Sequence, residues 1–238
     1  MWLTWRRYRV RLILLALYVV ALTICMLLTE HQIPNLVTGC GSVVTLTAHG
    51  RACVAARSHV LSRDQVIVLG ITFAPVLMAL SLGAPLVASE FQAKTNRLAW
   101  AQGVTRTKWL LVTWLTLTIP AMVLMSLLEL ATGWWATHVY GIAVVGQIQS
   151  VPTGLTGVAP VAIALFALSF GVCIGASFRS SSMSAAATLI GLVVVLTFIS
   201  IKVHGPQPLS QWGVAGIYVL LAGASLGLSV WTVRRLRA

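Results

Sequence analysis

The feature that most constrains the fold is a set of six long stretches that contain no Lys, Arg, Asp, Glu or His. The hydrocarbon core of a bilayer is about 30 Å thick, which a helix of about 20 apolar residues spans. Backbone groups in lipid must bond within their own segment, so each stretch is predicted to be a helix. We therefore expect an all-α integral membrane protein, with residues 1–238 forming a single transmembrane domain. The expected spans are residues 12–28, 66–88, 109–128, 154–178, 183–201 and 213–233.

The composition excludes an ordinary soluble domain. Only 8% of the 238 residues are charged and 58% are hydrophobic, whereas soluble domains average about 25% charged residues. The net charge of +12 would suggest nucleic acid in a soluble protein. Here the basic residues flank the apolar spans, where they face anionic headgroups. We therefore expect contact with membrane lipids and no binding of nucleic acid.

The sixteen Lys and Arg residues fall unevenly between the two sides of the expected membrane. Twelve of them lie beside the termini, between spans two and three, or between spans four and five. The other four are Arg51, Arg57, Arg63 and Lys202. Cytoplasmic loops carry the excess of basic residues, so both termini are predicted to be cytoplasmic.

Two of the four cysteines lie in the long segment between spans one and two. Cys40 and Cys53 enclose twelve residues on the predicted outer, oxidising side. A disulfide between them would stabilise this segment by about 3 kcal/mol, and two free thiols are the alternative. Cys25 and Cys173 lie within spans, where they are expected to pack as small apolar side chains.

The cytoplasmic segment between spans two and three contains a predicted short helix. Ser89 and Gln92 fit a capping box, and Gly103 fits a helix end. On a helix, Phe91 shares a face with a leucine seven residues later, while Trp100 points nearly opposite. A helix with apolar side chains on two faces either packs under the bundle or is covered by a partner.

Proline and glycine mark further positions within the spans. Pro75, Pro85 and Pro120 each remove a backbone donor, which produces either a static kink or a hinge. The pairs Gly171 with Gly175 and Gly223 with Gly227 allow close approach between helices. Such approach serves packing within one chain or contact with a second copy.

The sequence lacks the motifs that would let this chain consume nucleotide or catalyse a reaction. There is no GxxxxGK(S/T) phosphate loop, no HExxH and no pair of aspartates within a span. All acidic residues lie at or beyond the ends of the expected spans, and Glu129 follows the third span directly. We therefore expect no enzyme activity and no cofactor in this chain, so any active transport needs energy from another chain.

Three runs resemble one known family. GAPLVASEFQAKTNRLAWAQGVTRTKWL, from Gly83 to Leu110, is similar to the signature region of the permease subunits of type-2 ABC exporters, in particular the short six-span permeases of actinobacteria. WLTWR, from Trp2 to Arg6, resembles their start. GVAPVAIALFALSFGVCIGASFRSSSMSAAATL, from Gly157 to Leu189, resembles their fourth and fifth spans.

The resemblance implies a permease in a bacterial plasma membrane that pairs with itself or a sister subunit and binds two cytoplasmic ABC ATPase subunits. In that family the short cytoplasmic helix after span two sits in a groove of the ATPase and transmits its closure. ATP is bound by the ATPase subunits and not by this chain. The matching residues of this chain are Glu90, Thr95, Arg97, Leu98, Trp100, Gln102, Thr105, Arg106 and Trp109.

The chain departs from the family pattern at two points within this stretch. Relatives usually have Arg-Glu-Leu-Glu where this chain has Ser89 to Gln92, and Tyr or His where it has Asn96. These positions bear on which ATPase is accepted. Two other functions are compatible with the sequence: a membrane sensor or assembly protein on the same scaffold, and an enzyme acting on lipid through the histidines of the outer segments.

Overall fold

The computed structural model describes residues 2–37, 65–92, 105–143, 157–178, 180–203 and 211–235. Nearly all of these residues are helical, and no strand occurs among them. The helices are α1 (Trp2–Val37), η1 (Ala79–Gly83), α3 (Ala84–Gln92), α5 (Arg106–Ala143), α6 (Val158–Ser177), α7 (Ser181–Val203) and α8 (Gln211–Arg235). A further helix covers residues 65–78 and continues into η1 and α3; residues 65–92 are called span 2 below. Cys40 and Cys53 lie outside the described residues.

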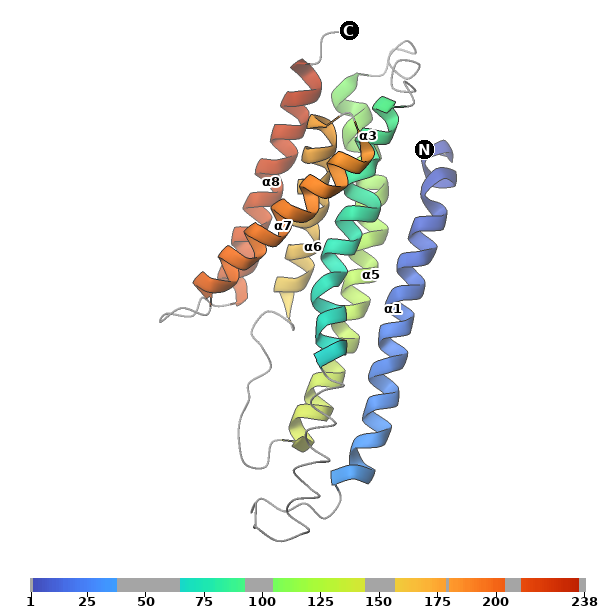
Figure 1. Cartoon of the computed structure of the whole chain (residues 1–238), viewed down its shortest axis with the longest axis vertical. Coiled ribbons are helices and arrows are strands. Elements are labelled where there is room, and N and C mark those ends of the chain that lie inside the picture. Colours follow the sequence, from blue (N-terminus) through green and yellow to red (C-terminus); the bar gives the residue numbers. More distant parts are fainter. Residues whose placement is uncertain are drawn as a thin grey trace.

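Six of these helices are long and apolar enough to cross a membrane, which confirms the predicted fold class. The segments are Tyr8–Thr29, Gln65–Ala88, Thr107–Ala136, Val158–Ser177, Ser181–Ile199 and Trp212–Arg235. Figure 1 shows four helix termini together at one end of the bundle: the starts of α1 and α5 and the last residues of α3 and α8. This end is called the basic end, because the exposed side chains of Arg9, Lys108, Arg234 and Arg235 belong to it.

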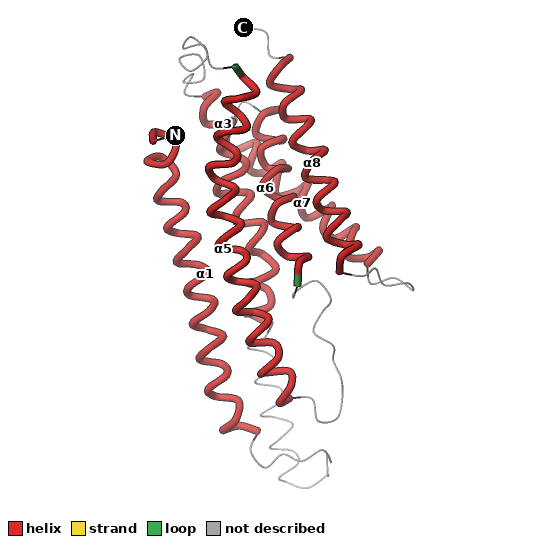
Figure 2. Tube along the Cα trace, turned by 180° about the vertical axis from the view of Figure 1, so that it is seen from behind, coloured by secondary structure: helices red, strands yellow, loops and turns green. Residues whose placement is uncertain are grey.

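The helix α6 is the central element of the bundle. In its apolar window 61% of the residues are buried, against 17% for α7 and 22% for the first span. Figure 2 shows α1 along one edge of the bundle and α7 with α8 at the opposite edge. The outer helices therefore direct most of their side chains towards lipid, while α6 is enclosed by protein.

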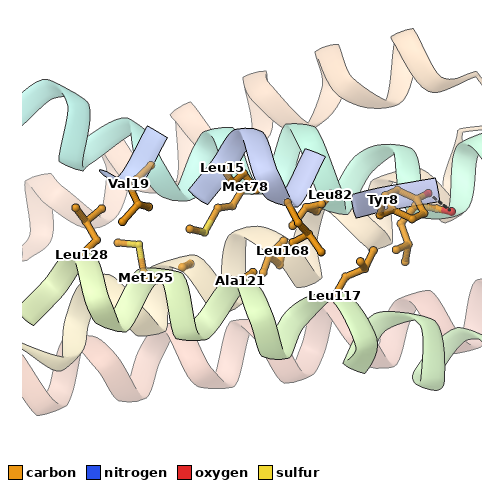
Figure 3. Packing of buried hydrophobic residues seen from close by; sticks show 14 of the residues in the cluster. Tyr8, Leu15, Val19, Met78, Leu82, Leu117, Ala121, Met125, Leu128 and Leu168 are labelled. Carbon is orange, nitrogen blue, oxygen red and sulfur yellow. Dashed lines mark hydrogen bonds between the residues drawn. The ribbon is translucent and has the colours of Figure 1, made fainter. Parts of the chain in front are cut away.

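The core is built from apolar side chains of several helices. Figure 3 shows Leu15 and Val19 of α1 facing Met78 of span 2, with Met125 of α5 and Leu168 of α6 on the other side. Lipid tails are as apolar as these side chains, so close packing, and not exclusion of water, supplies the stabilisation.

The backbones of span 2 and α6 are in direct contact where the two helices cross. A methyl group on Gly175 would lie 2.5 Å from the carbonyl oxygen of Ala84, and one on Gly171 would lie 3.0 Å from the Ala84 nitrogen. From the other side, a methyl group on Gly83 would lie 2.9 Å from the carbonyl oxygen of Leu168. Backbone touches backbone here, which only residues without a side chain allow. Gly171 and Gly175 thus serve packing within the chain.

The second glycine pair has a different environment. A methyl group on Gly223 or Gly227 of α8 would meet no atom within 4 Å. Sequence spacing alone could not distinguish the two pairs, because both have the same i, i+4 pattern.

This contrast yields a stability prediction with a matched control. Gly175→Ala pushes the added methyl group into backbone and is expected to lower the free energy of unfolding by about 1–3 kcal/mol. Gly227→Ala adds the same group in open space and should change stability by less than about 1 kcal/mol. Thermal unfolding of the purified chain in nanodiscs measures both. Equal losses in the two variants would contradict the packing described for α6 against span 2.

Candidate functional site

The coupling residues expected from the sequence divide between two helix ends and the segment that joins them. Glu90 belongs to α3 and Arg106 is the first residue of α5. Thr105 directly precedes α5, and Trp109 lies in its first turn. The other five positions lie outside the described residues, and they are Thr95, Arg97, Leu98, Trp100 and Gln102. The structure therefore describes how both ends of residues 93–104 are held.

The incoming end is α3, which is held by two other helices of the bundle. Leu86 and Val87 are buried. The hydroxyl of Ser184, at the start of α7, donates a buried hydrogen bond of 3.2 Å to the carbonyl oxygen of Ala84. Because Gly175 of α6 contacts the same residue, α3 cannot shift without displacing α6 and α7.

The helix α1 contacts the same region of span 2 through polar side chains. Arg11 donates a hydrogen bond of 2.9 Å from Nη1 to the carbonyl oxygen of Ser81. The buried hydroxyl of Tyr8 lies 3.4 Å from the carbonyl oxygens of Pro85 and Leu86. Further along the seam, the hydroxyl of Tyr18 donates to the carbonyl oxygen of Gly70 over 2.7 Å. These contacts join α1 to span 2 in an antiparallel pair.

The outgoing end is the start of α5. Thr105 caps this helix: its Oγ1 accepts a hydrogen bond of 3.4 Å from the Lys108 backbone N–H. From α8, Arg234 donates through Nε to Oγ1 of Thr107 over 3.1 Å. Leu110, one turn further, is fully buried. Sequence reasoning did not anticipate the contribution of α8, since nothing local links residues 107 and 234.

The backbone of span 2 is irregular immediately before α3. Residues Ala79–Gly83 form a π-helix, η1, between Pro75 and Pro85. Such wide turns often occur at functional sites. By contrast, α5 continues through Pro120 without interruption. Of the three prolines noted in the sequence, Pro85 is therefore the one that adjoins both a helix irregularity and the segment of interest.

Glu129 lies in a helix that is longer than expected. The helix α5 does not end at residue 128 but continues to Ala143, and Glu129 lies within the apolar segment Thr107–Ala136. Its Oε1 accepts a hydrogen bond from the backbone N–H of Gly157, the residue that precedes α6, while Oε2 is buried. The positive φ of Gly157, 96°, suits glycine. Glu129 therefore joins α5 to the start of α6.

This contact predicts unequal effects of two substitutions. Glu129→Ala removes the acceptor for Gly157 and should lower the free energy of unfolding by about 1.5–3 kcal/mol. Glu129→Gln keeps one carbonyl oxygen in place and should lower the free energy of unfolding by less than half as much as Glu129→Ala does. Thermal unfolding in nanodiscs compares the two variants. An alanine variant as stable as the native chain would show that Glu129 does not join these helices.

No site of metal or thiol chemistry is found in the described part of the chain. No three His, Cys, Asp or Glu side chains there approach one another closely enough to hold a metal ion. Cys25 and Cys173 are free thiols on separate helices.

Six spanning helices, with the ends of four elements gathered at a basic end, define a multi-pass membrane protein of the permease type. The model of the family described as ABC-2 membrane transporter related matches residues 13–204. The match covers most of the chain, which therefore belongs to this family. Neither a curated protein nor a solved structure matches the chain significantly.

Proposed function

We propose that this chain is the membrane subunit of an ATP-driven exporter and forms a translocation path with a second permease subunit, identical or related. Cytoplasmic ATPase subunits would bind the segment 89–108 at the basic end. The proposal agrees with the membership of the ABC-2 membrane transporter related family. That family's components associate with ABC ATPases in general.

The observation that carries the proposal is the anchoring of residues 93–104 at both ends. The α3 end is fixed to α6 and α7 through Gly175 and Ser184. The α5 end is fixed to α8 through Arg234. A displacement of the joining segment therefore acts on the central helix α6 and on α7 and α8 at one edge of the bundle. Packed helices respond to such a displacement as units, because their interiors do not deform continuously.

An external motor is required because the spans offer no group for ion coupling. The apolar stretches predicted from the sequence contain no charged residue or histidine. Glu129 lies within the apolar segment of α5, and its carboxylate accepts a hydrogen bond from Gly157 that joins α5 to α6. Coupling ions in transporters are usually carried by acids or histidines within the membrane.

Transport would proceed by alternation between two arrangements of the bundle. ATP binding brings the two ATPase subunits together, and their movement displaces residues 89–103. Because the two arrangements differ in their affinity for ATP, nucleotide binding and hydrolysis shift the population between them. The cargo class favoured by uncharged spans is apolar or amphipathic, since a charged cargo would find no fixed partner there.

Co-purification with an ATPase tests the proposal directly. The chain is co-expressed with the phosphate-loop ATPase encoded nearest to it and purified in mild detergent. We expect the ATPase to co-purify with the native chain. Arg97→Glu and Trp100→Ala should each lower its recovery at least tenfold, because a reversed charge and a lost aromatic anchor typically cost 2 kcal/mol or more at an interface.

Matched controls come from the opposite end of the molecule. Trp212→Ala changes an exposed tryptophan at the far end of α8, and Arg63→Glu reverses a charge on the predicted outer side. Neither should alter recovery of the ATPase. Full recovery with Arg97→Glu and Trp100→Ala would place the interface elsewhere, and no recovery with the native chain would contradict the proposed function.

A further inference from the structure

Pro85 leaves a gap in the hydrogen bonding of span 2. In an ordinary α-helix the backbone N–H of residue 85 would donate to the carbonyl oxygen of Ser81, four residues earlier. Proline has no N–H, and Pro85 follows η1 after one residue, Ala84, which donates to the carbonyl oxygen of Ala79 instead. Within a membrane no water replaces a missing donor. The backbone around Ser81 therefore has one donor fewer than a regular helix, and a side chain from another helix can supply it.

That side chain is Arg11 of α1, whose Nη1 donates to the Ser81 carbonyl oxygen over 2.9 Å. A guanidinium suits this role, because it is always charged and its planar fork fixes the direction of donation. The Arg11 guanidinium also lies 5.2 Å from the centre of the Tyr8 ring, which orients it. The Tyr8 hydroxyl in turn faces the carbonyl oxygens of Pro85 and Leu86.

The location of this contact gives it a consequence for coupling. Ser81 lies within η1, and Pro85 lies within α3, the helix that leads into residues 93–104. On its other face the same stretch touches α6 and α7 through Ala84. Arg11 and Tyr8 of α1 therefore contact this helix break in addition to α6 and α7.

We propose that Arg11 is a positioning residue that replaces the backbone donor lost at Pro85 and, with Tyr8, holds the break in span 2 rigid. Movement of the coupling segment then reaches α6 and α7 and is not absorbed at the break. This inference rests on the proposed function for its role in coupling, but its structural part stands independently.

A double-substitution cycle tests the structural part without any partner. The full chain is purified in nanodiscs, and its thermal unfolding is compared for Arg11→Met, Pro85→Ala and the double variant. Arg11→Met should lower the Tm by about 5 °C, because a carbonyl at membrane depth loses a charged donor. Pro85→Ala restores a backbone N–H. In the Pro85→Ala background, Arg11→Met should therefore lower the Tm by less than half as much as it does in the native background.

The control is Arg9→Met, an exposed arginine on the same helix that points about 160° away from Arg11. It should leave the Tm unchanged in both backgrounds. An equal loss from Arg11→Met with and without Pro85 overturns the inference. If Arg11→Met prevents folding, recovery of folded protein in the Pro85→Ala background supports it, and failure in both backgrounds overturns it.

A second measurement tests the role in coupling with the complex of chain and ATPase. Arg11→Met should leave the ATPase at native stoichiometry and the KM for ATP unchanged, while the kcat for ATP hydrolysis falls about fivefold. Arg11→Lys should lower kcat less than Arg11→Met does. The double variant of Pro85→Ala with Arg11→Met should recover most of the lost kcat. An unchanged kcat overturns the coupling role. If no ATPase binds even the native chain, the proposed function fails, and the thermal cycle still decides whether Arg11 replaces the donor lost at Pro85.

Discussion

A chain embedded in lipid must provide a partner for every backbone polar group, and this requirement organises the whole molecule. It forces the apolar stretches into helices, and it makes each irregularity in a helix dependent on a neighbour. Span 2 shows the dependence most clearly. Its π-helix, Ala79–Gly83, and Pro85 break the regular pattern, and Arg11 of α1 supplies a donor at that point. The break is thus maintained by contacts between helices.

The same stretch of span 2 is also where the backbones approach most closely. Gly171 and Gly175 bring α6 against Gly83 and Ala84, and Ser184 adds a hydrogen bond from α7. Contacts from α1, α6 and α7 therefore converge within about three turns of the segment that joins α3 to α5. The proposed ATP-driven function requires that a displacement at the basic end reach the central helix, and these contacts are the route that we propose for it.

Much of the fold could be predicted because the six spans are long and uncharged, and a bilayer leaves such stretches only one regular structure. The spacing of Gly171 and Gly175 predicted close approach, yet the identical spacing of Gly223 and Gly227 faces open space, since spacing carries no information about the partner. Arg11 looked like an ordinary flanking charge, because its bond to Ser81 joins positions 70 residues apart. The extension of α5 beyond residue 128 was not predicted, because apolar residues give way to polar ones before this helix ends. The coupling residues between positions 93 and 104 rest on the family resemblance alone.

The central claim is that the segment between α3 and α5 lies in the cytoplasm, where a soluble motor can bind it. Labelling with a membrane-impermeant maleimide tests this claim most directly, in a variant with the four native cysteines replaced and one cysteine introduced as Ala99→Cys. Gln147→Cys, on the predicted outer side, serves as the reference. The account predicts that intact cells label Gln147→Cys but not Ala99→Cys, and that permeabilised cells label both. Labelling of Ala99→Cys in intact cells would contradict it.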